Sequence, residues 1–289
     1  METLKLGALG TLSLSCSDGR DLSRVLAQPK RFALLTYLAL ARPKGYHRRD
    51  SLLSLFWAEV DDTHARNSLS QALSFLRREL PDGLVLTRGT EEVRLDHGRV
   101  SSGVEAFEDA IARDRWADAL DLYTGDFLRG FHLPGAFGFE AWLEVERERL
   151  RESVAGAAWS LAHEQIDHGK LVDAERTGQR ALGFVWSDET AVREFIQALA
   201  RAGDKAAAVR FYEKFRSRLW DELEIEPSDS TAGVAASIRN GEYSSPDGAS
   251  GSGPVRRTDP SLASPGTANV PPGVDSADGT PESPSDLGD

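Results

Sequence analysis

A spacing of 34 residues recurs in the second half of the sequence and restricts its fold more than any other feature. Gly169 and Gly203 are separated by this distance, and so are Ala174 and Ala208. Each glycine stands between two stretches with the apolar periodicity of a short helix. Units of this length bury their apolar faces only by stacking on neighbouring units. Residues 101–242 are therefore expected to form an all-α domain of stacked helix pairs.

The period is that of tetratricopeptide-like repeats, in which a small residue in the second helix is typical. A related half-unit, RWADALDLY at 115–123, is similar to KAAAVRFY at 205–212. With few units, the array is expected to be a compact module with capping helices rather than a long solenoid. The turn between the two units is apolar, which indicates either local burial or a partner surface, and it consists of Phe184, Val185, Trp186 and Ser187.

The first hundred residues follow a different pattern, in which strands enclose three helices. Residues 4–14 alternate loosely around two glycines, which predicts short strands. Three helices are expected next, and they begin near Pro29, Arg48 and His64. The segment LVLTRGTEEVRL then predicts a β-hairpin with Arg88 at its tip. This order predicts an α+β winged helix-turn-helix domain of the OmpR type over residues 1–100.

The third of these helices has two unlike faces. Its apolar side chains fall on one stripe at helical spacing, and they are Ala65, Leu69, Ala72, Leu73, Leu76 and Leu80. The opposite face has side chains suited to base edges in the major groove: Asn67, Ser70, Gln71, Ser74 and Arg78. Asn67 and Gln71 have the paired donor and acceptor that match adenine, and Arg78 can fork onto guanine. An ordinary amphipathic helix facing water is the alternative for this pattern.

Arginines around this face are expected to contact DNA phosphates. They are Arg48, Arg49, Arg66, Arg77 and Arg88. Glu91 and Glu92 lie just beyond Arg88 and repel phosphates, so we expect the wing to contribute less than the helix. A solvated turn residue is the alternative for Arg88.

The net charge of −12 is distributed unevenly. Residues 1–100 have 15 Lys and Arg against 12 Asp and Glu, residues 101–242 have 17 against 27, and residues 243–289 have 2 against 7. The positive excess therefore lies in the first hundred residues. This asymmetry favours a nucleic-acid-facing domain joined to an acidic, protein-facing one. The last segment is rich in Pro, Gly and Ser, which predicts a disordered acidic tail over 243–289.

Several function classes are not expected. His163 and His168 are five positions apart with no convergent carboxylate or Cys, so a metal site is not expected. No phosphate-binding glycine loop or nucleophile motif occurs. We therefore expect no enzyme activity, no metal and no cofactor. No apolar run is long enough to span a membrane, and the N-terminus has no signal-peptide pattern. The single cysteine, Cys16, indicates a reducing compartment, and we expect a cytoplasmic location.

The order of these motifs resembles the SARP-type family of antibiotic-regulatory proteins, which join an OmpR-like winged helix to a bacterial transcriptional activator domain (BTAD). The resemblance covers about residues 1–242, and it is carried by ARNSLSQALSFLRREL (65–80), ALDLYTGDFLRGF (119–131), AWLEVERERL (141–150) and ALARAGDKAAAVRFYEKFRSRLWDELEIEPSDST (198–231). It implies a bacterial, nucleoid-associated transcriptional activator. Such a protein binds promoter repeats in double-stranded DNA, self-associates there and contacts the RNA polymerase holoenzyme.

Two departures from the family pattern accompany the resemblance. Glu91 and Glu92 occupy the region where the wing usually has a glycine-aromatic pair, and the apolar turn at 184–187 replaces an Asp-Pro turn.

The second hypothesis for the function is a tetratricopeptide-type adaptor whose winged helix does not read specific DNA. The acidic second domain and the mildly basic first one are its support.

Overall fold

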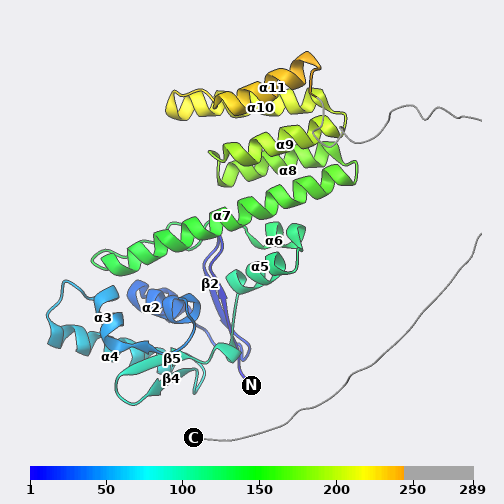
Figure 1. The fold of residues 1–289 in the computed structure, drawn as a ribbon. Coiled ribbons are helices and arrows are strands. Elements are labelled where there is room, and N and C mark those ends of the chain that lie inside the picture. Colours follow the sequence, from blue (N-terminus) through cyan, green and yellow to red (C-terminus); the bar gives the residue numbers. More distant parts are fainter. Residues whose placement is uncertain (244–289) are drawn as a thin grey trace, which may run out of the picture. The chain divides into compact units, whose positions relative to one another are not determined.

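The computed structural model describes residues 1–243 (Figure 1). The expected tail over 243–289 lies outside the described residues except for Tyr243. Within the described part, no helix has the length and apolar character needed to cross a membrane.

The N-terminal part combines two small sheets with four helices. One sheet has the strand order β2-β1-β6, with β1 (Leu4–Gly7) antiparallel to β2 (Ser13–Cys16) and parallel to β6 (Val100–Ser102). The other has the order β3-β5-β4, formed by β3 (His47–Arg48), β5 (Glu92–Leu95) and β4 (Val85–Arg88). The helices are α1 (Ser23–Leu26), α2 (Pro29–Leu40), α3 (Arg49–Phe56) and α4 (Asp62–Glu79). The expected strands, three helices and hairpin are all present.

The differences from the sequence expectations are local. The short helix α1 was not foreseen, and Arg48 ends strand β3 instead of beginning a helix. The parallel partner β6 was also missed, because it joins residues almost a hundred positions apart. Helix α4 begins two residues earlier than expected, where the Asp61 carboxylate accepts a hydrogen bond from the His64 backbone N–H at 3.1 Å.

The remainder of the described chain is helical. Its helices are η1 (His97–Arg99, a 3₁₀ turn), α5 (Gly103–Ala112), α6 (Trp116–Leu122), α7 (Phe137–Asp167), α8 (Leu171–Phe184), α9 (Glu189–Arg201), α10 (Lys205–Leu223) and α11 (Asp229–Asn240). Helices α7 and α8 form one contacting pair, and α9 and α10 form another. Gly169 and Gly203 occupy the turns within these pairs at φ of 71° and 94°, a conformation that favours glycine. The 34-residue repeat is therefore confirmed as a helical-repeat arrangement.

Helix α7 connects the repeats to the N-terminal part through one hydrophobic core. Its first turns contact α3, while its later turns contact α8 (Figure 1). The ring centroids of Phe139 and Phe56 lie 5.1 Å apart, and those of Trp142 and Tyr37 lie 5.0 Å apart. The buried apolar side chains of both parts belong to a single cluster. The expected division of the chain near residue 100 remains a prediction, because this core crosses it.

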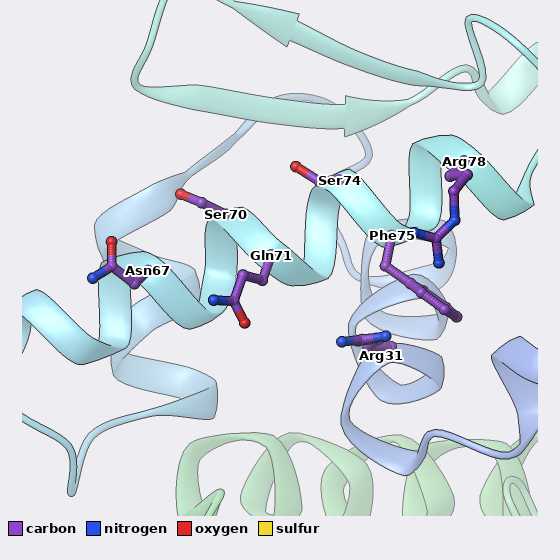
Figure 2. Close-up of a pocket in the computed structure, with 7 residues that line it drawn as sticks. All are labelled: Arg31, Asn67, Ser70, Gln71, Ser74, Phe75 and Arg78. Atoms are coloured by element: carbon purple, nitrogen blue, oxygen red, sulfur yellow. The ribbon is translucent and has the colours of Figure 1, made fainter.

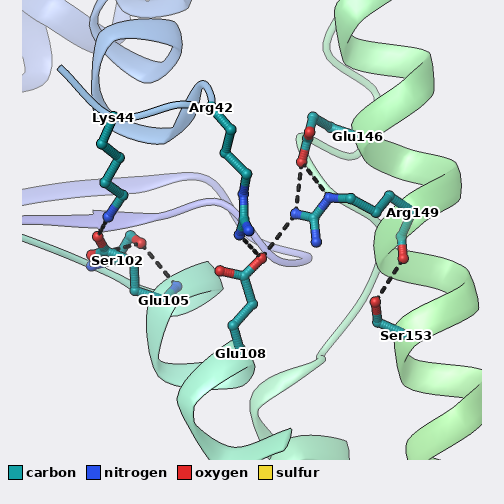
Figure 3. A network of polar contacts seen from close by, with 8 residues as sticks. All are labelled: Arg42, Lys44, Ser102, Glu105, Glu108, Glu146, Arg149 and Ser153. Atoms are coloured by element: carbon teal, nitrogen blue, oxygen red, sulfur yellow. Dashed lines mark hydrogen bonds and ion pairs between the residues drawn. The ribbon is translucent and has the colours of Figure 1, made fainter. Parts of the chain in front are cut away.

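A network of ion pairs accompanies this apolar contact (Figure 3). Arg42 and Lys44, in the loop after α2, pair with Glu108 and Glu105 of α5. Arg149 of α7 reaches the same Glu108, with 2.9 Å between Nη2 and Oε1. Glu108 is thus shared by two arginines from elements far apart in the sequence. The network links the loop after α2, helix α5 and helix α7.

Two half-buried histidines next to strand β5, His47 of β3 and His97 of η1, predict a pH-dependent stability. Burial lowers the pKa of His47 and of His97 from the ordinary 6.5, and each ring has a buried nitrogen without a hydrogen-bond partner in the described chain. The unfolded chain then binds more protons than the folded one below about pH 6.5, so the free energy of unfolding falls as the pH decreases. We expect the melting temperature to decrease from about pH 7.5 to about pH 5.5.

The matched test uses His47→Gln and His97→Gln, which remove the titrating groups. Thermal unfolding across the same pH range should then show a shallower slope for each variant. A slope that is unchanged in both variants would assign the pH dependence to other groups, such as His163, whose pKa burial also lowers.

Candidate nucleic-acid interface

Helix α4 separates its side chains as its sequence predicts. The buried face contains Ala65, Leu69, Ala72, Leu73, Phe75 and Leu76, with Leu80 buried just after the helix. The stripe predicted from the sequence omitted only Phe75. On the other face, Asn67, Ser70, Gln71, Ser74 and Arg78 are all exposed. Arg20 fixes the end of the helix, because its Nη1 donates to the Leu80 carbonyl at 2.9 Å.

The five predicted base-contacting residues lie together. They line one shallow depression of about 520 Å³, together with Arg31 and Phe75 (Figure 2). The side chains of Asn67, Ser70, Gln71 and Ser74 form no hydrogen bond with another residue of the described chain. Their donors and acceptors are therefore free for an external ligand. That this ligand is a base edge remains a prediction.

Arg31 is a residue of this surface that the sequence interpretation missed. It belongs to α2, and its guanidinium carbon lies 4.1 Å from the centroid of the Phe75 ring. The Arg78 guanidinium approaches the same ring at 5.3 Å and also pairs with Glu79 at 2.9 Å. Two arginines thus stand around one aromatic ring, which holds them in place. The sequence offered only a weak signal, namely the Lys30-Arg31 pair at the start of a buried helix.

The predicted phosphate-contacting arginines differ in how strongly they are neutralised. Arg66 pairs with Asp62 at 2.9 Å and with Asp50 at 3.1 Å, and the hydrogen bond to Asp62 raises the pKa of Arg66. Arg77 is exposed and has no carboxylate partner within residues 1–243. A phosphate competes with no resident anion at Arg77, whereas at Arg66 it must compete with two.

Arg48 and Arg49 lie beside the hairpin. Arg48 is exposed at the end of β3. Arg49 is half-buried, and its backbone N–H donates to the Glu91 carbonyl at 2.8 Å. Its Nε is buried without a partner in the described chain. Arg48 is therefore the more accessible of the two cations.

The hairpin tip has a compensated charge. The Nε of Arg88 donates to Glu92 at 2.5 Å, and the Arg88 guanidinium lies 4.6 Å from the centroid of the Tyr46 ring. The hydrogen bond between Arg88 and Glu92 raises the pKa of Arg88 and lowers the pKa of Glu92. The sequence predicts that the wing contributes little to DNA binding. The structure gives a reason, because Arg88 already forms an ion pair with Glu92. Arg88 as a phosphate ligand remains a prediction.

The other polar clusters of the described chain do not form a metal centre. No group of three or more His, Cys, Asp or Glu side chains in residues 1–243 has a geometry that could hold a metal ion.

The apolar turn at the end of α8 is half-buried. The ring centroids of Phe184 and Tyr123 lie 5.5 Å apart, and the guanidinium carbon of Arg218 lies 5.9 Å from the centroid of the Trp186 ring. Local packing therefore accounts for much of its apolar character.

Comparison with known proteins identifies the family of the chain and a similar fold. The family model described as the bacterial transcriptional activator domain matches residues 94–239. A search of curated proteins gave no significant match. Among solved structures, the chain is similar to Mycobacterium tuberculosis EmbR in complex with a low affinity phosphopeptide, with 18% identity and a TM-score of 0.60. That match covers 84% of this chain and 66% of the EmbR chain, so this chain spans just under two thirds of EmbR.

The fold likeness and the family match together confirm the resemblance to SARP-type regulators. The match to EmbR supports the fold, since a winged helix and a helical repeat occur in the same order. The family match covers half of the chain and includes every repeat helix from α5 to α10. The chain therefore belongs to the bacterial transcriptional activator domain family of transcriptional regulators.

Proposed function

We propose that this regulator is an activator that binds promoter repeats in double-stranded DNA with the exposed face of α4. The observation that carries the proposal is the shared depression of Asn67, Ser70, Gln71, Ser74 and Arg78. An exposed helix face of this kind fits the major groove, where side-chain amides and guanidinium groups distinguish base pairs. The unpaired amides favour this proposal over a plain solvated face.

Cationic side chains lie on both sides of the depression, where the phosphate backbones of the two DNA strands are expected. At helical spacing, Arg77 lies on the same flank of α4 as Ser70, seven residues earlier. Arg31 lies on the flank of Gln71 (Figure 2). A helix seated in the major groove has a phosphate backbone on each side. We propose Arg77 and Arg31 as the principal phosphate ligands of the two backbones, with Arg48 as a further one.

Gln71→Ala tests the base-contacting role. We expect this variant to lose discrimination between the preferred duplex and a single-base variant by about 1–3 kcal/mol, because a bidentate contact to adenine is removed. Arg31→Ala is the contrasting variant. It should weaken binding to every duplex alike and reduce the slope of log affinity against log salt by about one unit. Binding to selected duplexes at two salt concentrations measures the base discrimination and the salt slope. An unchanged base preference in Gln71→Ala would contradict the base-contacting role of Gln71.

A pair of arginine variants tests whether resident carboxylates limit phosphate contact. Arg77→Ala should lower affinity for all duplexes and reduce the salt slope by about one unit, because Arg77 is unpaired in the described chain. Arg66→Ala should have a smaller effect, since Asp62 and Asp50 already hold this side chain. Equal losses in the two variants would show that DNA displaces both carboxylates.

The proposal includes self-association on DNA. The face of α4 has two serines and few long side chains, so one copy distinguishes sequences weakly. Two copies on repeated half-sites multiply that discrimination. The acidic helical part supplies contacts between copies and to the RNA polymerase holoenzyme, and a nucleoid-associated, cytoplasmic location follows from this role.

An adaptor that uses its winged helix for protein contact is the second candidate. The pairing of Arg66 and Arg88 with carboxylates favours it, because these pairs reduce the positive potential around α4. Partner binding without any salt-dependent affinity for DNA would support the adaptor. A salt-dependent affinity that Arg77→Ala lowers would support the activator.

A further inference from the structure

The C-terminal end of α10 has an exposed apolar surface. Trp220, Leu223 and Ile225 are 53%, 51% and 49% exposed, and we call these three residues the α10 patch. Trp220 and Leu223 lie three positions apart on one side of the helix, and Ile225 follows its end. Trp220 also lines a shallow depression of about 260 Å³ with Glu226. Adjacent exposed apolar side chains of this size are typical of protein contacts.

Carboxylates without cationic partners alternate with the α10 patch. Asp221, Glu222 and Glu224 are exposed, and none of them pairs with Lys, Arg or His in residues 1–243. The neighbouring Glu226 behaves differently, because Arg216 holds it with two hydrogen bonds of 2.6 and 2.9 Å. The patch therefore has an uncompensated charge of three negative units around its apolar side chains.

The backbone conformation at the end of α10 determines where the helix stops. Glu224 ends the helix at φ of 57°, a left-handed conformation that glycine adopts without steric cost. A residue with a Cβ atom, such as Glu224, adopts this conformation less readily than glycine does. Helix α10 therefore stops at Glu224, and Ile225 lies beyond its last turn.

We infer that the α10 patch binds a basic amphipathic helix of a partner protein. Leu-like side chains of that helix cover Trp220 and Leu223, while its Lys or Arg side chains meet the three carboxylates. A second copy of this chain is a poor occupant, because a symmetric contact places like charges opposite each other. The inference specifies the partner contact proposed above and rests on it.

A synthetic peptide provides the probe. It has about four helical turns, with leucines on one face and lysines elsewhere. One comparison peptide has the same composition in scrambled order, and another has glutamate in place of lysine. Fluorescence anisotropy with the full chain should show binding of the first peptide and affinities at least about tenfold lower for the others. The affinity for the first peptide should fall with added salt.

Variants locate the binding site. Leu223→Lys should lower the peptide affinity at least about tenfold, the effect expected at the centre of a contact. Val172→Lys is the matched control, because Val172 of α8 is 76% exposed and the change in net charge is the same. It should leave the affinity unchanged. The triple variant Asp221→Asn, Glu222→Gln and Glu224→Gln keeps the shape and should remove most of the salt dependence.

Two results would overturn the inference. Equal peptide affinity in the wild type and in Leu223→Lys would place the peptide elsewhere. Self-association in sedimentation equilibrium that Leu223→Lys abolishes would assign the patch to a second copy. DNA affinity is measured in parallel and should be the same in Leu223→Lys and the wild type. A failure of peptide binding is thereby distinguished from a failure of the DNA-binding proposal.

Discussion

Phe139→Ala should lower the free energy of unfolding by about 3–5 kcal/mol, the largest effect that we expect from a single substitution in this chain. Phe139 is fully buried in α7 and lies against Phe56 of α3, Phe131 and Trp142, with ring centroids 5.1, 6.1 and 5.4 Å away. Truncation removes these contacts and leaves a cavity that rigid neighbours cannot fill. For a chain of this size, the melting temperature should fall by about 10 °C.

Phe137→Ala is the control for this prediction. Phe137 lies two residues earlier on the same helix and is 64% exposed, so its truncation should change the stability by about 0.5 kcal/mol or less. Because the core is continuous, calorimetry should also show one transition that shifts as a whole in Phe139→Ala. Two transitions, of which only one moves, would show that the winged helix and the repeats unfold independently.

Arg147→Met should lower the free energy of unfolding by about 3 kcal/mol, although it keeps most of the side-chain volume. The largely buried Arg147 donates from Nε to the Phe127 carbonyl at 2.9 Å. Its Nη2 donates to the carbonyls of Leu128 and Phe131 at 2.7 and 3.0 Å. Methionine leaves three acceptors in this loop without their charged donor, and a buried acceptor without a partner costs about 1–3 kcal/mol.

The backbone of the same loop explains why it depends on Arg147. Leu128 is fully buried and has φ of 46°, a conformation that disfavours a branched side chain. Its N–H donates to the Ala8 carbonyl at 2.8 Å, which ties the loop to the residues after β1. Arg147 and Ala8 together hold Leu128 in this conformation. Loss of either bond removes one of the two contacts that hold Leu128 in place, while the aromatic contacts of α7 with α2 and α3 remain.

Glu144→Gln distinguishes this role from that of a surface ion pair. Glu144 is the exposed partner of Arg147, with 2.5 Å between Oε1 and Nη1. Its neutral variant keeps all three carbonyl contacts and should cost no more than about 1 kcal/mol in chemical denaturation. Similar losses in Glu144→Gln and Arg147→Met would contradict the importance of the carbonyl contacts.

Local periodicity accounts for what the sequence predicted well. The apolar stripe of α4, the hairpin after it and the glycines at 169 and 203 all depend on residues close in sequence, and all three are confirmed. The clustering of the predicted base-contacting residues follows from the same helical spacing. Their contact with bases remains a prediction, because no local pattern identifies a ligand.

Contacts between distant segments account for what the sequence missed. The position of Arg31 beside Phe75 depends on how α2 crosses α4, and no spacing within either helix specifies that crossing. The neutralisation of Arg66 by Asp50 likewise requires the packing of α3 against α4. The pairing of Arg42 with Glu108 joins residues 66 positions apart. Each of these pairs is fixed by tertiary structure.

Helix α7 has a consequence for the proposed binding to promoter repeats. Helix α7 packs on α3 at one end and on α8 at the other, and α3 packs on α4. The direction of α4 is therefore coupled to the repeats, which we propose to hold two copies together. Two such copies engage equivalent grooves only when their half-sites have the same rotational phase on the duplex, about 10–10.5 base pairs apart or a multiple of that. Insertion of half a helical turn between the repeats should therefore abolish joint occupancy, and insertion of a full turn should partly restore it.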